Sequence, residues 1–259
     1  MGALDSYAVL VTRPEQQAGT LASLIQAQGG SAILAPMVGI RPLADGPALN
    51  RQLDAAAGAD IGIFVSRNAV TYTLDAKGME PARLRHMTLF AVGLGTAREL
   101  RERGMDTVLT PSSVFSSEGL LELPELAAAA VDGRAITIFR GRGGRETLAG
   151  ALAKRGATVS YCEVYERFLP EVSLAAAIAE SGGAEPDIML VTSVEGLTNL
   201  ADRIGEEGLD RLFSTPILVP GNRIAAEAEK LGFSETVVVN NPGDARMVEA
   251  LINWAEGEW

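Results

Sequence analysis

The 259-residue chain carries a net charge of −11, from 22 basic and 33 acidic residues, and it contains a single cysteine. Because nucleic-acid binding needs a basic face, this charge argues against a nucleic-acid-binding protein. No apolar run approaches the roughly 18 residues that span a bilayer, the N-terminus lacks the pattern of a secretory signal, and one cysteine excludes an internal disulfide framework. We therefore expect a cytoplasmic globular protein, and the length predicts about two domains.

Strand and helix patterns alternate along the whole chain. In the first half we predict, in order, strand 8–12, helix 15–27, an extended run 31–40, helix 48–57, strand 61–65, helix 69–77, strand 89–92, helix 96–103, strand 107–109 and a short helix 118–123. In the second half we predict strand 136–140, helix 145–155, an extended run 158–168, helix 173–181, strand 188–192, helix 194–204, strand 216–219, helix 223–230, strand 236–240 and helix 245–255. Such alternation predicts α/β units, each a small doubly wound parallel sheet of the flavodoxin-like type with helices on both faces.

The second half repeats the first at an offset of 127 residues (136 minus 9), which aligns Val9 with Ile136. At this offset Arg13 meets Arg140, and the segment DIGIFVS from residue 60 meets DIMLVTS from residue 187. Self-similarity at a fixed spacing indicates an internal duplication.

The loops that follow the predicted strands are where a ligand is expected, because open parallel sheets bind ligands at the carboxyl ends of their strands and helix N-termini there bind anions. These loops are rich in hydroxyl residues, glycine and arginine, and arginine binds carboxylates and phosphates bidentately. They read TRP from residue 12, VSRNAV from 65, AVGLGTA from 91, FRGRGGRE from 139, VTSVEG from 191 and VPGNRIA from 219.

The common catalytic signatures are missing. Glu146 stands where a dinucleotide fingerprint would need its third glycine, and no Walker A lysine follows a glycine-rich loop. His86 is the only histidine and Cys162 the only cysteine, which leaves little material for a metal site or a cysteine–histidine pair. We expect no cofactor and no metal, with His86 facing solvent and Cys162 packed in the interior.

Seven motifs together resemble one known family. They are LVTRP at residues 10–14, FVSRNAV at 64–70, AVGLGTAREL at 91–100, SSEGLL at 116–121, FRGRGGRETLAGALAKRGA at 139–157, VYER at 164–167 and TSVEGLTNL at 192–200. Their order and spacing over nearly the whole chain resemble the uroporphyrinogen-III synthases, cofactor-free enzymes that cyclise hydroxymethylbilane on the way to haem.

The resemblance implies two flavodoxin-like domains joined by a two-stranded linker, one of them built from both ends of the chain. Domain 1 would comprise residues 1–37 and 172–259, domain 2 residues 48–160, and the linker residues 38–47 and 161–171. The alternation of strands and helices by itself leaves two sequential domains equally open.

The resemblance also implies a reaction. Hydroxymethylbilane loses its terminal hydroxyl to give an azafulvene, the last pyrrole ring is attacked at its substituted carbon, and a spiro intermediate recloses with that ring inverted. Such catalysis rests on orientation with modest acid assistance. The eight substrate carboxylates would be held by helix N-termini and arginines of both domains.

The resemblance implies partners as well. It implies a monomer that contacts hydroxymethylbilane synthase transiently, and it implies no nucleic-acid or membrane partner.

Tyr165, in the VYER motif, is the candidate catalytic residue, because the family places there a tyrosine that assists loss of the hydroxyl. The alternative is an amphipathic side chain packed at a domain joint. For the hydroxyl and amide residues of the binding-loop motifs, the alternative is helix capping. These residues are Ser66, Asn68, Thr96 and Ser193.

Gly221 and Arg223 belong to the loop VPGNRIA, which departs from the threonine-bearing pattern of the family because Ile224 stands at the place of the threonine. Arg223 is therefore the expected carboxylate contact of this loop. Arg13, Arg140 and Arg145 pair either with substrate carboxylates or with acidic residues and helix ends of the protein itself.

Two functions of other classes stay open. One is a two-domain small-molecule-binding protein of the periplasmic type, although the missing signal pattern and the VYER motif count against it. The other is a regulatory protein that keeps this scaffold without catalysis. Binding without turnover would identify either one.

Overall fold

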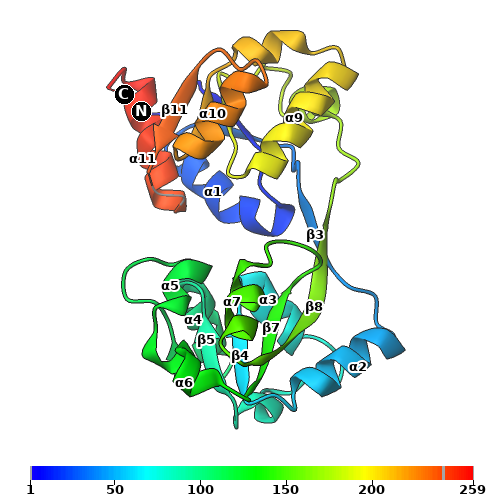
Figure 1. Ribbon diagram of the computed structural model, residues 1–259. Coiled ribbons are helices and arrows are strands. Elements are labelled where there is room, and N and C mark those ends of the chain that lie inside the picture. The colour runs from blue at the N-terminus through cyan, green and yellow to red at the C-terminus, as the bar shows by residue number, and fades with distance from the viewer. Residues whose placement is uncertain (1, 241–242, 259) are drawn as a thin grey trace. The chain divides into compact units, whose positions relative to one another are not determined.

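The computed structural model describes residues 2–240 and 243–258 (Figure 1). The chain divides into two compact units, unit 1 of Met1–Gly39 with Phe168–Trp259 and unit 2 of Ile40–Arg167. Residues 40–47 and 161–167, expected in a linker, group with unit 2, and the separate linker stays a prediction. No helix in the described part of the chain has both the length and the apolarity needed to cross a bilayer.

Unit 1 contains a five-stranded sheet in the order β11-β10-β9-β1-β2. All its pairs are parallel. In terms of the strands' order along the chain this is the 2-1-3-4-5 order of flavodoxin-like sheets. The strands are β1 (Ala8–Val11), β2 (Ser31–Leu34), β9 (Ile188–Leu190), β10 (Ile217–Pro220) and β11 (Thr236–Val239).

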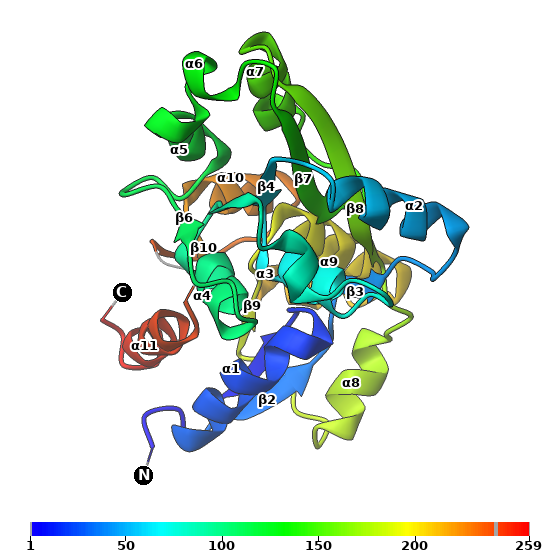
Figure 2. The same ribbon diagram turned by 90° about the horizontal axis from the view of Figure 1, so that it is seen from below.

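Helices cover both faces of this sheet because side chains alternate along each strand. Val9 and Val11 pack against α1 (Glu15–Ala27) and α11 (Asp244–Ala255), which lie side by side (Figure 1; Figure 2). Ala8 and Leu10 pack on the opposite face. That face is covered by α8 (Leu174–Glu180), α9 (Val194–Glu206) and α10 (Asn222–Lys230), with a 3-10 turn at Asp210–Ser214.

Unit 2 contains a six-stranded sheet in the order β3-β8-β7-β4-β5-β6. The pairs from β8 to β6 are parallel. The strands are β3 (Gly39–Pro42), β4 (Ile61–Phe64), β5 (Thr88–Ala91), β6 (Val108–Leu109), β7 (Ala135–Gly141) and β8 (Thr158–Phe168). β3 and β8 each extend one residue past the boundary between the units.

The two faces of this sheet are again both covered. Phe64 and Phe139 stack with ring centroids 4.3 Å apart on the face of α2 (Pro47–Ala56), α3 (Arg67–Leu74) and α4 (Leu94–Glu102). Ile63 and Ile138 pack on the other face. That face carries α5 (Ser117–Leu121), α6 (Ala128–Val131) and α7 (Thr147–Lys154), with a 3-10 turn at Pro124–Leu126. A further 3-10 turn, Pro81–Leu84, packs on the first face through Leu84.

The duplication is visible in the strand registers. Val9 lies opposite Ile188 in unit 1, and their repeat counterparts Ile136 and Ile61 lie opposite each other in unit 2. Each unit therefore combines the first strand–helix–strand segment of one repeat with the remaining strands of the other. The predicted fold of two doubly wound parallel-sheet units from one duplication is confirmed.

Some predicted boundaries were wrong. The extended run 31–40 is two strands, β2 and β3, in different sheets, because Pro36 lacks an N–H and restricts the residue before it. The helix expected from residue 145 begins at Thr147, because Gly143 and Gly144 adopt left-handed φ angles of 73° and 102°. Helix α6 and the 3-10 turns were not predicted.

Candidate active site

The loop between β4 and α3 places Ser66 at the carboxyl edge of the unit 2 sheet. Ser66 has extended backbone angles and is the N-cap of α3, where its Oγ accepts a hydrogen bond of 3.1 Å from the Ala69 N–H. Such a cap satisfies one of the free N–H groups of the first turn. Asn68, in that first turn, is half-buried. The capping alternative therefore holds for Ser66, and substrate contact by these two residues stays a prediction.

Tyr165 lies on β8 and points its hydroxyl at Ser66. The phenol oxygen is 3.1 Å from the Ser66 Oγ, and only 5% of the residue is exposed. Gly141 of β7 lies against the ring, since a Cβ at that position would be 2.4 Å from a Tyr165 ring carbon. Tyr72 of α3 packs with its ring centroid 5.7 Å away. The phenol is therefore held in one position.

An irregularity in the β7–β8 pairing produces this placement. Arg140 lies opposite Glu163, but the next residue, Gly141, lies opposite Tyr165, so Val164 is an extra residue. A bulge of this kind redirects the side chains that follow it. The main-chain N–H of Arg142 then bonds the Tyr165 carbonyl at 2.7 Å.

The arginines of the loop FRGRGGRE have carboxylate partners inside unit 2. The buried Arg140 lies 3.4 Å from Glu146, with its guanidinium 4.5 Å from the Tyr161 ring centroid. Tyr161 donates a hydrogen bond to Glu146, and burial together with that carboxylate raises the pKa of Tyr161. Arg145 is exposed and lies 3.6 Å from Glu118.

The N-terminal turn of α4 forms the neighbouring part of this edge. Thr96 is buried in that turn, which follows the N-cap Gly93. The aliphatic part of Arg67 lies beside Gly95, since a Cβ there would be 3.6 Å from the Arg67 Cδ. Arg67 is exposed, and no carboxylate among the described residues pairs with it. Arg67 lies in the motif FVSRNAV and directly after a predicted strand, but it was not among the predicted substrate contacts.

The corresponding loops of unit 1 carry the other predicted residues. Ser193 caps α9 by accepting a hydrogen bond of 3.0 Å from the Gly196 N–H, as its repeat counterpart Ser66 does in unit 2. Gly221 precedes α10 with a left-handed φ of 92°, and Arg223 is exposed in the first turn of that helix. Arg13 is buried and forms an ion pair with Asp244 at the start of α11.

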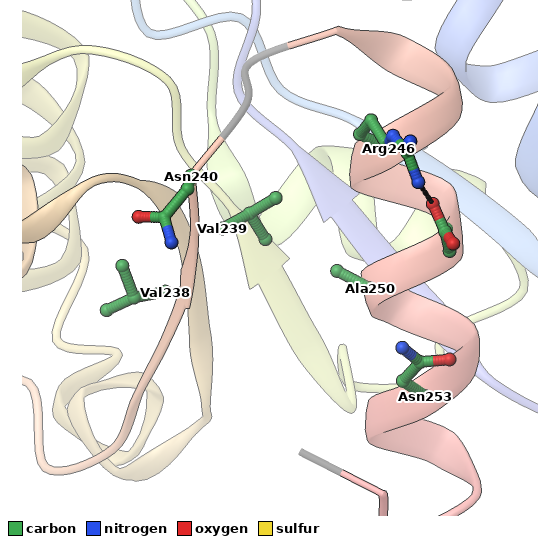
Figure 3. A pocket seen from close by; sticks show the side chains of 7 residues that line it. Val238, Val239, Asn240, Arg246, Ala250 and Asn253 are labelled. Carbon is green, nitrogen blue, oxygen red and sulfur yellow. Dashed lines mark hydrogen bonds and ion pairs between the residues drawn. The ribbon is translucent and has the colours of Figure 1, made fainter.

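A pocket elsewhere in unit 1 contains none of the predicted site residues. It lies between β11 and α11, where Arg246 pairs with Glu249 at 2.6 Å (Figure 3). Its lining consists of Val238, Val239, Asn240, Arg246, Glu249, Ala250 and Asn253. We do not place the active site in this pocket. Its one arginine, Arg246, is already paired with Glu249, and no other residue in its lining is a candidate for substrate binding or catalysis.

The residues for a metal or thiol site do not come together. Across residues 2–240 and 243–258, no group of three His, Cys, Asp or Glu side chains is placed to hold a metal ion. Cys162 is buried, and burial, with a smaller effect of Glu163, raises the pKa of its thiol to about 12. A protonated thiol is a poor nucleophile.

These features define a duplicated, two-unit α/β protein whose strand-end loops carry helix caps and arginines, with one buried phenol on a neighbouring strand. The sequence model of the family described as "Uroporphyrinogen-III synthase HemD" matches residues 19–249. The chain therefore belongs to the uroporphyrinogen-III synthase family.

Individual relatives agree with this assignment. The chain is 31% identical to the uroporphyrinogen-III synthase of Escherichia coli (strain K12) and 32% identical to that of Salmonella typhimurium, covering 94% of this chain and 99% of each relative. Its fold resembles the crystal structures of the synthases from Thermus thermophilus, with a TM-score of 0.63 at 18% identity, and Helicobacter pylori, with 0.58 at 14%. These alignments cover 98% and 96% of this chain and 100% and 99% of the respective structures.

Proposed function

We propose that this protein is a uroporphyrinogen-III synthase, which cyclises hydroxymethylbilane to uroporphyrinogen III with loss of water and inversion of ring D. The observation that carries the proposal is the family match over residues 19–249. The strand-end loops support it, because capped helix N-termini and arginines are suited to a substrate with many carboxylates.

Most of the catalysis is orientation. The substrate's own pyrroles supply the reactive carbons, so the protein's task is to hold the bilane where attack at the substituted carbon is favoured. Arg67 and Arg223 are exposed and lack carboxylate partners in the described part of the chain. We infer that these two are the first carboxylate contacts, whereas the ion-paired Arg13, Arg140 and Arg145 must exchange a partner to bind substrate.

Tyr165 is the proposed acid. Its phenol O–H can give its proton to the departing hydroxyl. A Tyr165→Phe variant keeps the buried ring and loses only the hydroxyl, so we expect turnover to fall severalfold with little change in thermal unfolding. Wild-type turnover in this variant would remove Tyr165 from the mechanism.

A coupled assay tests the function. Hydroxymethylbilane is generated in place, with and without this protein, and the oxidised uroporphyrin isomers are separated by chromatography. Predominantly type III product is expected, because the uncatalysed reaction gives type I. Type I product alone, formed at the uncatalysed rate, would contradict the proposal.

Three finer features are also proposed from the family resemblance. We expect the protein to act in the cytoplasm, to be monomeric, and to contact hydroxymethylbilane synthase transiently. Light scattering tests the monomer, and cross-linking to that synthase during turnover tests the contact.

A further inference from the structure

The contact between Ser66 and Tyr165 joins two residues that are 99 positions apart in sequence. A serine hydroxyl has one proton to donate and two lone pairs with which to accept. The Ser66 Oγ already accepts from the Ala69 N–H at 3.1 Å, so its proton and one lone pair remain. The Tyr165 oxygen lies 3.1 Å away and forms a hydrogen bond with either that proton or that lone pair.

The internal duplication provides a comparison within the same molecule. At the offset of 127 residues, Ser66 corresponds to Ser193 and Tyr165 to Val38. Ser193 makes the same cap, and a Cβ built on Gly196 would lie 3.1 Å from the Ser193 Oγ and 3.6 Å from the Val38 Cγ2. Val38 is buried, with 6% of its surface exposed.

In both units the capping serine therefore lies near the equivalent residue of a neighbouring segment. That residue is Val38 in unit 1, and only in unit 2 is it a tyrosine, Tyr165. A buried valine satisfies the packing in unit 1, so the cap and the fold do not require a hydroxyl partner for the serine. The Ser66–Tyr165 hydrogen bond is an addition to the shared architecture.

We propose that Ser66 is a positioning residue for Tyr165, donating its proton to the phenol oxygen so that the phenol proton is directed at the substrate hydroxyl. This inference rests on the proposed function. The opposite arrangement, in which Tyr165 donates to Ser66, would occupy the only proton that Tyr165 can give. The positive end of α3 and the Ala69 N–H both favour Ser66 as the donor, because they draw electron density from its Oγ.

The C–O bond of the hydroxymethyl group breaks, the electron pair stays on the oxygen, and the Tyr165 proton converts that oxygen to water. The phenolate formed on Tyr165 accepts the Ser66 hydrogen bond until it regains a proton from the bilane, which releases one proton when the ring closes. Tyr165 is the catalytic residue, and Ser66 acts through it.

The test compares variants of the full chain by kcat, KM and thermal unfolding, with hydroxymethylbilane generated in place. Ser66→Ala removes both the cap and the donor, and we expect kcat to fall about fivefold with KM changed less than about twofold. Ser66→Thr keeps both and should restore most of the wild-type kcat. Ser66→Asp keeps a good cap but cannot donate, so it should retain the wild-type unfolding temperature and lose kcat.

Ser116→Ala is the matched control, because Ser116 caps α5 in the same unit through a hydrogen bond of 3.2 Å from the Gly119 N–H. It should lower the unfolding temperature as Ser66→Ala does and leave kcat unchanged. In a Tyr165→Phe background, Ser66→Ala should lower kcat no further, because the phenol through which Ser66 acts is gone.

Three results would overturn the inference: a kcat for Ser66→Ala equal to that of Ser116→Ala, full kcat in Ser66→Asp, or the same fold-loss from Ser66→Ala with and without the Tyr165 hydroxyl. Any of these with type III product would leave the proposed function standing. Type I product from the wild-type protein would instead overturn the proposed function, and the role of Ser66 with it.

Discussion

At the scale of single residues, the position of the Tyr165 ring depends on an absent side chain. Position 141 does not require glycine for its φ angle, since Gly141 is not among the residues with positive φ. It requires glycine because any side chain would clash: a Cβ would lie 2.4 to 2.9 Å from three atoms of the Tyr165 ring. The ring is buried and cannot move aside without leaving Ser66.

We therefore expect Gly141→Ala to lower the free energy of unfolding by about 1–3 kcal/mol, as overpacking of a core does, and to lower kcat as well. Denaturant unfolding and the coupled assay measure the two effects. Gly150→Ala is the control, because it lies in helix α7 with open space around a built Cβ. That change should stabilise by about 0.5–1 kcal/mol. Unchanged stability and kcat in Gly141→Ala would contradict the packing argument.

The buried thiol of Cys162 gives a second prediction at this scale. Its folded-state pKa of about 12 lies above the ordinary value of 9.0. Thiol reagents attack the thiolate, so we expect no labelling of the native protein at pH 8 and rapid labelling in denaturant. The same shift makes the stability of the protein depend on pH. The contribution of the neutral thiol is complete below the unfolded-state value and declines as the pH rises above it towards 12. Fast labelling of the native protein would contradict this.

At the scale of elements, the first turn of helix α8 is hydrogen-bonded to Glu207, the C-cap residue of helix α9. The Glu207 carboxylate accepts hydrogen bonds from the Leu174 N–H at 2.9 Å, the Ala175 N–H at 2.8 Å and the Ser173 hydroxyl at 3.0 Å. Burial alone would raise the pKa of Glu207, but these hydrogen bonds together with the nearby charge of Arg203 outweigh it, and the pKa is lowered.

Glu207→Gln keeps the size of the side chain and removes its charge. We expect a loss of about 0.5–1 kcal/mol in the free energy of unfolding at pH 7. Because the folded-state pKa is lowered, the wild-type advantage is present above the ordinary value of 4.5 and disappears as the pH falls through the folded-state value. Denaturant unfolding at pH 7 and pH 3 measures it.

The neighbouring Glu206 provides the control. Its ion-pair partner among the described residues is Arg203, 3.5 Å away on the helix surface. Glu206→Gln should change stability by less than about 0.5 kcal/mol. Equal losses in the two variants, or a loss for Glu207→Gln that persists at pH 3, would contradict the anchoring role.

At the scale of the whole molecule, the two units differ in how the chain builds them. Unit 2 is continuous in sequence, whereas unit 1 takes β1, α1 and β2 from one end of the chain and everything else from the other. β1 lies inside its sheet between β9 and β2, and Val9 and Val11 belong to the core beneath α1 and α11.

This difference predicts different behaviour of fragments. Residues 40–167 should fold alone with a cooperative thermal transition. Residues 168–259 alone should not, because β9 would lose its inner neighbour and the core would lose the apolar face of α1. A permuted chain, with residues 168–259 followed by a glycine–serine linker and residues 1–39, should recover cooperative unfolding by circular dichroism. Cooperative unfolding of 168–259 by itself would contradict this account.

Much of the architecture could be predicted from the sequence. The 3.6-residue and two-residue periodicities located helix 15–27 and the extended run 158–168 with the bounds of α1 and β8. The helix-capping serines could be predicted too, because Ser193 directly precedes the predicted helix 194–204 and Ser66 lies three residues before the predicted helix 69–77. Short pieces such as α6 were missed, since four residues carry too little periodicity.

The sequence by itself determined the duplication, the doubly wound fold, the family and the residue types at each strand end, because periodicity and motif order are local properties. Only the tertiary structure decided which of those residues meet. The Ser66–Tyr165 contact depends on the order β8-β7-β4 and on one extra residue in β8, and the partner of Arg13 comes from the far end of the chain. Strand order and register arise from packing between distant segments, and no local pattern records them.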